Sequence, residues 1–271
     1  MIIFGKEIAE RIKNDLVRRV AEASAPVSFG IVTAGTQVVT EKYLAVKKKF
    51  GTDIGVTVDI RAGNTESTDA FVQTVLETVS AHKAVIVQLP LPTALNREKI
   101  LLCVPKEADV DVLSLEACAA FASGESPFIP PVLSAIQKVL GEGKITLLGK
   151  KIVIVGKGQL VGTPVSEWLT RERMAHDIIT KDTSEEEKGM LLRSADVIIS
   201  GAGVPHMITP DMVKDGVVLI DAGTTEDSGV LVGDVDPLCA EKAALFTPVP
   251  GGIGPITVAT LYENVLRAHG I

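Results

Sequence analysis

The chain has 271 residues, and its 34 acidic and 27 basic side chains give a formal net charge of −7. Hydrophobic residues make up 46% of the sequence and charged residues 23%, a globular balance that excludes a disordered or collagen-like chain. The negative charge and the aromatic content of 4% argue against nucleic acid or an anionic membrane as the main partner.

The cysteines and histidines show no pattern of a disulfide or metal framework. The 3 cysteines share no CxxC spacing, and the 4 histidines have no metal-ligand spacing, so we expect reduced thiols and no metal site.

The chain passes at once into an amphipathic helical pattern, with Ile8, Ile12, Leu16 and Val20 at helical spacing. With no signal peptide and no apolar run long enough for a bilayer, the sequence predicts a cytoplasmic protein without a membrane segment.

Short apolar runs alternate with helical patterns along the first half of the chain. The runs near 27–32, 54–60 and 84–89 predict buried strands, and the segments 37–50 and 68–81 predict helices between them. Continuous Val/Ile runs joined by helices are typical of a parallel sheet that is covered on both faces.

The second half repeats this alternation, with predicted strands at 152–155, 177–180, 197–200 and 217–220. Gly, Ser and Pro residues at 122–131 interrupt the pattern and mark a domain boundary. The sequence therefore predicts an α/β protein of two domains with a cleft between them. The last helix, about 256–268, cannot be placed by periodicity alone.

A glycine-rich turn follows the strand at 152–155. Gly156, Gly158 and Gly162 would let the backbone approach a pyrophosphate at the start of a helix, where free amides attract it. A tight structural turn could use the same glycines, but the strand before and the helix after favour dinucleotide binding. Two further strand ends, 200–203 and 221–223, would line the same crevice, and ordinary tight turns are the alternative there.

The predicted strand end at 179–182 lies where ribose recognition is expected. An acidic group there favours NAD, whereas a basic or hydroxyl group accepts the 2′-phosphate of NADP. The sequence has both Lys181 and Asp182 at this position, so this pattern alone does not distinguish NAD from NADP. It also does not show whether either side chain contacts the ribose.

Thr40, Tyr43 and Lys47 share one face of a predicted helix because they are spaced by three and four residues. A lysine beside an aromatic hydroxyl in a cleft can transfer protons. A solvated basic face is the alternative, since further lysines lie close by.

Gln88 ends the buried run 84–89, and its amide needs partners, either in the backbone or on a ligand. Asp109 and Asp111 lie on one side of an extended segment, where they could bind the amino groups of a ligand or cap the following helix. The stretch 247–257 is rich in Gly and Pro, which suits either a rigid loop against a flat ligand or a structural hinge.

Together these segments resemble the bifunctional methylenetetrahydrofolate dehydrogenase/methenyltetrahydrofolate cyclohydrolase family. The similarity extends over nearly the whole chain, in the family's order and at similar spacings. The matching segments are YLAVK (43–47), VIVQLPLP (85–92), ADVD (108–111), GKKIVIVGKGQLVGTP (149–164), ADVIISGAG (195–203), LIDAG (219–223), GDVD (233–236) and TPVPGGIGPIT (247–257).

The resemblance implies a folate-binding catalytic domain at 1–125 that includes the C-terminal helix 255–271, and a Rossmann-type cofactor domain at 126–254. It also implies a homodimer that acts on one-carbon derivatives of tetrahydrofolate. Lys47 would be the central catalytic group, Gln88 would hold and tune it, and Tyr43 would orient the folate. Asp111 would bind the amino-pyrimidine edge of the pterin, while Pro250, Gly251 and Gly252 would flank the aminobenzoate.

The implied cofactor is NADP, with NAD as the alternative. Lys157 and Lys181 replace the family's usual residues near the adenosine phosphate and keep positive charge there, which favours NADP. Val112 replaces a glycine that usually follows the second aspartate. The residues expected at the cofactor are Gly156, Lys157, Gly158, Val161, Gly162, Lys181, Gly201, Ala202, Gly203, Gly223 and Thr224.

The sequence thus predicts oxidation of 5,10-methylenetetrahydrofolate to the methenyl form, followed by hydrolysis to 10-formyltetrahydrofolate. The cofactor-binding segments differ from the family's usual residues. Two alternatives therefore stay open: a cyclohydrolase without dehydrogenase activity, and a variant that uses NAD. A non-catalytic folate-binding paralogue and a generic Rossmann dehydrogenase are weaker alternatives, because the first leaves Lys47 and Gln88 unused and the second leaves the first domain unexplained.

Overall fold

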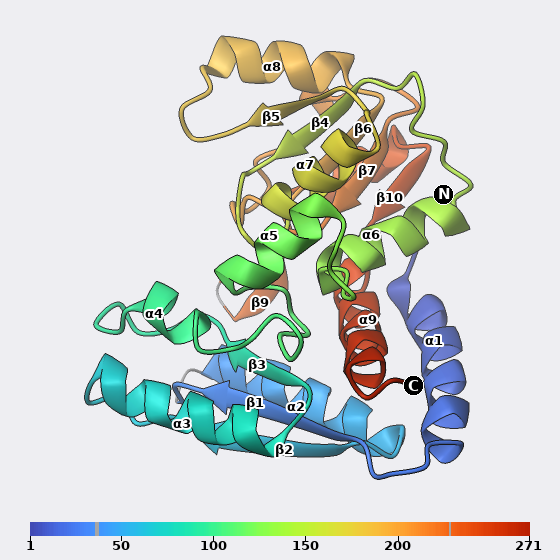
Figure 1. Cartoon of the computed structure of the whole chain (residues 1–271). Coiled ribbons are helices and arrows are strands. Elements are labelled where there is room, and N and C mark those ends of the chain that lie inside the picture. The colour runs from blue at the N-terminus through green and yellow to red at the C-terminus, as the bar shows by residue number, and fades with distance from the viewer. Residues whose placement is uncertain (36–37, 228) are drawn as a thin grey trace. The chain divides into compact units, whose positions relative to one another are not determined.

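The computed structural model describes residues 1–35, 38–227 and 229–271, and only the backbone of residues 38–40 and 42. The chain forms two compact units (Figure 1). Residues 10–131 and 258–271 make one, named here the Lys47 unit, and residues 1–9 and 132–257 make the other, the Gly156 unit. The predicted architecture of two α/β domains is confirmed. The predicted domain ranges stay a prediction.

A parallel sheet in the order β2-β1-β3 forms the centre of the Lys47 unit. Phe71 and Val75 from α3 pack with Val32, Val85 and Val87 in its buried apolar cluster. The helices and strands that lie in this unit wholly or in large part are α1 (Gly5–Ala21), β1 (Ser28–Thr33), α2 (Val38–Asp53), β2 (Thr57–Ala62), α3 (Thr68–Ala81), β3 (Val85–Gln88), α4 (Arg97–Leu101), α5 (Leu115–Ser123) and α9 (Ile253–Ala268).

Local signals explain why these elements form where they do. Helix α3 spans the residues that periodicity predicted, and Ser67 caps it by accepting a hydrogen bond from the Ala70 N–H at 3.1 Å. The side chain of Asn96 caps α4 in the same way through the Lys99 N–H at 3.0 Å. The predicted strands of the first half are found within about three residues of their expected ends.

The Gly156 unit contains a parallel sheet in the order β10-β7-β6-β4-β5. Alternate strand residues such as Val153, Val155 and Ile198 pack against Leu191 and Leu192 of α8, which buries this face of the sheet. The elements of this unit are α6 (Pro131–Glu142), β4 (Ile152–Val155), α7 (Gly162–Arg171), β5 (His176–Ile179), α8 (Glu185–Ser194), β6 (Val197–Ser200), η1 (Pro210–Met212), β7 (Val218–Asp221), β8 (Thr225–Asp227), β9 (Val230–Val232), η2 (Pro237–Glu241) and β10 (Leu245–Thr247).

Strand order reverses beside β4, because the chain leaves β4 toward β5 and later returns to β6 on its other side. In a doubly wound sheet such a switch point opens a crevice at the carboxyl ends of the strands. The residues that follow β4 and β6, Gly156 and Gly201, therefore lie where a dinucleotide is expected.

The N-terminal residues join the sheet of the Gly156 unit. The Ile3 N–H donates to the Phe246 carbonyl at 2.9 Å, and the Phe246 N–H donates to the Met1 carbonyl at 2.9 Å. The first residues of the chain thus complete this unit beside β10.

Within the described ranges, no helix is long and apolar enough to cross a membrane. The three cysteines are free thiols, and the residues that the structure describes contain no group of three side chains suited to holding a metal ion.

Candidate active site

Lys47 and Gln88 meet in the Lys47 unit. Lys47 lies on α2 and Gln88 ends β3, and the Lys47 Nζ donates a hydrogen bond to Gln88 Oε1 at 2.8 Å. Gln88 Nε2 in turn donates to the Leu89 carbonyl at 2.6 Å, so the amide is held in one orientation. The amide of Gln88 therefore has a backbone partner, and Lys47 is its second partner. Its contact with a ligand stays a prediction.

Burial lowers the pKa of the Lys47 ammonium below its ordinary value, and the negative charge of Asp111 opposes that effect. Burial likewise raises the pKa of the Asp111 carboxyl, while the positive charge of Lys47 lowers it. Each group thus offsets part of the other's desolvation. A lysine whose pKa is lowered is suited to accept and return a proton near neutral pH.

The two aspartates of the segment 108–111 have different surroundings. Asp109 is buried, and its Oδ2 accepts hydrogen bonds from the Leu113 N–H at 2.9 Å and the Ser114 N–H at 2.6 Å. Ser114 is the N-cap of α5, so Asp109 stabilises the approach to that helix. Burial raises the pKa of Asp109 to about 6. Asp111 is the aspartate that interacts electrostatically with Lys47.

Val112, which follows Asp111, has a left-handed backbone conformation with φ 58° and is buried. A β-branched residue is strained there, by about 1–3 kcal/mol. Its N–H donates to the Asp109 carbonyl at 3.2 Å, and its carbonyl accepts from Cys118 Sγ at 3.3 Å. The turn that presents Asp111 is therefore held in this strained conformation from both sides.

Tyr43 lies one turn before Lys47 on α2 and is partly exposed, with 36% of its surface accessible. Its contact with a ligand stays a prediction. The side chain of Thr40, the third residue of that predicted face, lies outside the described residues.

Two residues of α9 that the sequence did not single out support this site. The Tyr262 hydroxyl donates to the Lys47 carbonyl at 2.7 Å, and its ring stacks on Phe50. Asn264 Nδ2 donates to the carbonyls of Val110 at 2.9 Å and Ile129 at 2.8 Å. The signal available in the sequence was the hydrogen-bonding side chains of Tyr262 and Asn264 in a helix that contains many apolar residues.

The glycine-rich turn in the Gly156 unit has the close backbone packing that a pyrophosphate cradle requires. Gly156 has φ 92°, and a Cβ there would lie 2.9 Å from the Ala202 Cα. A Cβ on Gly162 would collide with the Gly156 carbonyl, whereas one on Gly158 would have 3.8 Å to its nearest neighbour. Gly156 and Gly162 close the turn, and Gly158 leaves space over it, which fits a dinucleotide at the start of α7.

The other predicted cofactor residues divide into packing residues and exposed ones. Val161 is buried, and its side chain fills the position that a Cβ on Gly201 would occupy. The Ala202 N–H is already used within the protein, because it donates to Asp234 at 2.7 Å. Thr224 is exposed beside Gly223.

Lys157 and Lys181 are exposed at neighbouring strand ends. Val155 of β4 pairs with Ile179 of β5, and each lysine follows its strand two residues later. Both lysines therefore lie at the same edge of the sheet, where positive charge favours a phosphate.

Pro250, Gly251 and Gly252 belong to the Gly156 unit. The Gly251 carbonyl accepts from the Gly5 N–H at 2.7 Å, and the Gly252 N–H donates to the Pro248 carbonyl at 2.7 Å. These bonds fix the backbone of the loop, and its contact with a substrate stays a prediction.

Two family models match the chain. The "Tetrahydrofolate dehydrogenase/cyclohydrolase, catalytic domain" model covers residues 3–111, and the "NAD(P)-binding domain" model of the same family covers residues 130–270. The bifunctional protein FolD of Exiguobacterium sibiricum is 31% identical over 99% of both chains. That of Staphylococcus aureus strain Newman is 32% identical over 99% of this chain and 96% of its own length.

Solved structures agree with this assignment. The bifunctional FolD methylenetetrahydrofolate dehydrogenase/cyclohydrolase of Campylobacter jejuni superposes with a TM-score of 0.92 at 28% identity, covering 100% of this chain and 98% of its own. The Trypanosoma brucei enzyme, solved with NADP cofactor and an inhibitor, gives 0.92 at 27% identity, covering 100% and 97%. The chain belongs to the tetrahydrofolate dehydrogenase/cyclohydrolase family.

Proposed function

We propose that this protein oxidises 5,10-methylenetetrahydrofolate to 5,10-methenyltetrahydrofolate with NADP and hydrolyses the product to 10-formyltetrahydrofolate. The hydrogen bond between Lys47 and Gln88, with the Asp111 charge acting on Lys47, is the observation that supports it most directly. The glycine-rich turn of the second unit supplies the complementary cofactor site.

Lys47 is the catalytic group for hydrolysis in this proposal. The methenyl carbon is already a strong electrophile, so water attack needs placement and a proton acceptor rather than a covalent nucleophile. The neutral amine of Lys47 takes a proton as the water oxygen bonds to the bridge carbon. That proton returns to the folate N5 as the bond between the carbon and N5 breaks. The remaining hydroxyl proton is lost to solvent as the carbonyl of the formyl group forms on N10.

Gln88, Tyr43 and Asp111 position the reactants. Gln88 orients the Lys47 amine through the 2.8 Å hydrogen bond, and Tyr43 contacts the folate ring. Asp111 binds the amino-pyrimidine edge, since a carboxylate can accept hydrogen bonds from its N–H groups. Pro250, Gly251 and Gly252 flank the aminobenzoate.

The cofactor residues Gly156, Gly158, Gly201 and Gly203 line the dinucleotide crevice. NADP, when bound, accepts the hydride from the one-carbon bridge. Lys157 and Lys181 bind the 2′-phosphate, because positive charge at this edge of the sheet favours a phosphate. The relative from Trypanosoma brucei, solved with NADP, supports the choice of cofactor.

A parallel assay tests both activities and the cofactor choice. Purified protein receives methylenetetrahydrofolate with NADP or with NAD, and methenyltetrahydrofolate alone, while the methenyl absorbance is followed. Reduction of NADP and accelerated loss of the methenyl form are expected. Absence of both would refute the proposal.

A cyclohydrolase without dehydrogenase activity is the second candidate, favoured by the unusual Lys157 and Lys181. In the same assay it would remove the methenyl form and reduce neither cofactor.

We also propose that the protein is a cytoplasmic homodimer without nucleic-acid partners. Family resemblance supports the dimer, and the net charge of −7 supports the absence of nucleic-acid binding. Sedimentation equilibrium would reveal a mass twice the 28.6 kDa of the chain, and a single-chain mass would contradict the dimer.

A further inference from the structure

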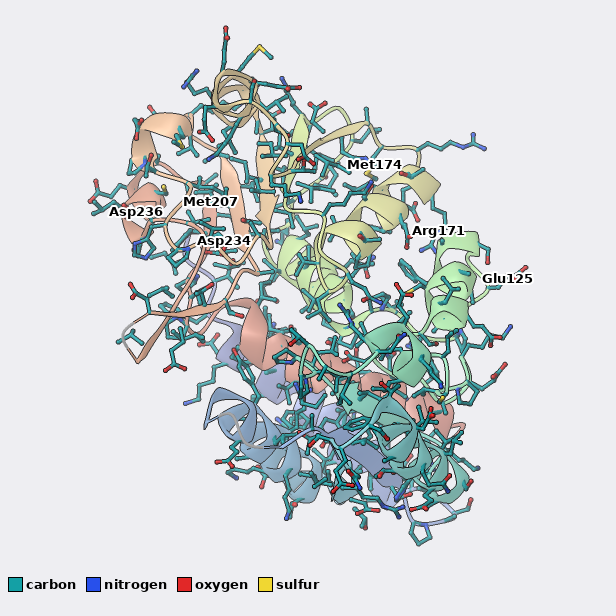
Figure 2. The ribbon with its side chains drawn as sticks, turned by 90° about the vertical axis from the view of Figure 1, so that its left-hand side faces the viewer. Glu125, Arg171, Met174, Met207, Asp234 and Asp236 are labelled. Atoms are coloured by element: carbon teal, nitrogen blue, oxygen red, sulfur yellow. The ribbon has the colours of Figure 1, made fainter. Side chains whose placement is uncertain are left out.

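A buried carboxylate that the proposed reaction does not use binds the loop after β6. Asp234, labelled in Figure 2, follows β9 and is 0% exposed. Its Oδ2 accepts hydrogen bonds from Ser200 Oγ at 2.6 Å and the Ala202 N–H at 2.7 Å, and its Oδ1 accepts from the Val204 N–H at 2.8 Å. Asp234 therefore accepts three hydrogen bonds from the last residue of β6 and the loop that follows it.

Because of these bonds, most backbone N–H groups of residues 201–204 already donate hydrogen bonds within the protein. The Gly201 N–H donates to the Val155 carbonyl at 2.9 Å, and Asp234 takes those of Ala202 and Val204. Gly203, with φ 69°, lies between them, and its carbonyl accepts from Thr225 Oγ1 at 2.9 Å. Among the described residues, the Gly203 N–H is the amide of residues 201–204 that has no acceptor.

Two glycines leave the space that the carboxylates of Asp234 and Asp221 occupy. A Cβ on Gly223 would collide with the Asp234 carboxylate, and one on Gly233 would collide with the Asp221 carboxylate. Asp221 itself accepts from the Gly223 N–H at 3.0 Å and the Val235 N–H at 2.9 Å. The chain after β6, β7 and β9 is therefore held together around two carboxylates at the carboxyl edge of the sheet.

We propose that Asp234 is a positioning residue of the dinucleotide site, which fixes residues 201–204 so that the Gly203 amide stays available to the cofactor. This inference rests on the proposed function, in which the loop contacts NADP. A loop fixed in its binding conformation before the ligand arrives loses less entropy on binding. Removing Asp234 should therefore weaken cofactor binding and leave the folate chemistry of Lys47 intact.

Asp234→Asn tests the proposal with little change in shape. The amide retains one acceptor oxygen, so at least one of the three hydrogen bonds is lost. We expect the dissociation constant of NADP, measured by calorimetry, to rise about tenfold or more. Cyclohydrolase activity, assayed without cofactor, should stay within about twofold of the wild type because no bond to Lys47 changes.

Ser200→Ala is the milder variant, and it keeps the test valid if Asp234→Asn does not fold. It removes one donor and should raise the dissociation constant of NADP by a smaller factor. Asp196→Asn is the matched control, since Asp196 lies at the opposite end of β6 and accepts from the Lys151 N–H and from Lys214 Nζ, each at 2.7 Å. It should lower stability without changing NADP affinity.

Wild-type NADP affinity in Asp234→Asn, or an equal loss of both activities, would overturn the positioning role. Failure of the proposed cofactor function has a different signature, because the wild-type protein itself would then bind neither NADP nor NAD.

Discussion

The Lys47 ammonium donates to the Gln88 amide oxygen at 2.8 Å, across 41 residues of sequence. The helix α2 and the strand β3 supply one partner each, and the lysine carbonyl is held by Tyr262 from α9. The reactive end and the backbone of the same residue are therefore fixed by different segments of the chain.

Replacing Lys47 by Ala should lower the turnover number of the cyclohydrolase about 100-fold or more, because it removes the group that takes the proton from water. The loss of methenyl absorbance after the enzyme is mixed with methenyltetrahydrofolate measures this turnover number. Lys48→Ala is the matched control, an exposed lysine on the same helix that should retain activity. Equal turnover of the Lys47 variant and the wild type would mean that Lys47 is not the catalytic group.

Gln88→Glu should change the pH dependence of the cyclohydrolase rate. A carboxylate next to Lys47 favours its charged form, so the ascending limb of the pH–rate profile should move to higher pH by about one pH unit or more. Gln88→Ala removes the hydrogen bond without adding charge, and it should slow the reaction without that alkaline displacement. An unchanged limb in Gln88→Glu would mean that Lys47 is not the titrating group.

The glycine-rich turn provides a pair of substitutions with opposite expectations. Gly162→Ala forces a Cβ onto the Gly156 carbonyl and should cost about 1–3 kcal/mol of unfolding free energy, measured by urea denaturation. In Gly158→Ala the added Cβ would lie 3.8 Å from its nearest neighbour, the Gly201 carbonyl oxygen, so the unfolding free energy should stay nearly unchanged. Because that added methyl group enters the space over the turn, NADP affinity should fall in Gly158→Ala.

Asp221 should give the stability a specific pH dependence. Burial, opposed by backbone hydrogen bonds and reinforced by the Asp234 charge, raises its pKa from 3.8 to about 7. The folded state then holds a proton that the unfolded state has released, so this stabilisation is full below pH 3.8 and is lost as the pH rises through 7.

Asp221→Asn cannot lose that proton. Between pH 4 and 7 the wild type should therefore lose unfolding free energy relative to the variant, and Asp109, which is present in both proteins, cancels in the difference. Parallel denaturation curves at each pH give the measurement. A constant difference across this range would show that Asp221 is ionised throughout.

Tyr262→Phe tests the support that α9 gives to the catalytic lysine. The variant retains the ring that stacks on Phe50 and loses the hydrogen bond to the Lys47 carbonyl, so unfolding free energy should fall by about 1 kcal/mol. Cyclohydrolase turnover should fall severalfold with little change in KM, because the lysine is displaced rather than the substrate. A purely structural role would change stability alone.

Local sequence patterns were enough to predict many of the helices and strands and to select candidate site residues. Val/Ile runs and helical spacing are local properties, so the strand 152–155 and the helix 68–81 were predicted at their observed bounds. The residue types at strand ends likewise identified Gln88 and Gly156, because parallel strands present their carboxyl ends at one edge.

Tertiary structure alone decided which polar groups are partners. Spacing could not tell that Asp109 caps a turn while Asp111 acts on Lys47, since both lie on one extended segment. Asn264 binds the Val110 carbonyl across 154 residues, and Asp234 binds Ser200 across 34. A buried polar group must find a partner wherever the fold brings one, and periodicity, which describes only neighbours along the chain, does not contain that information.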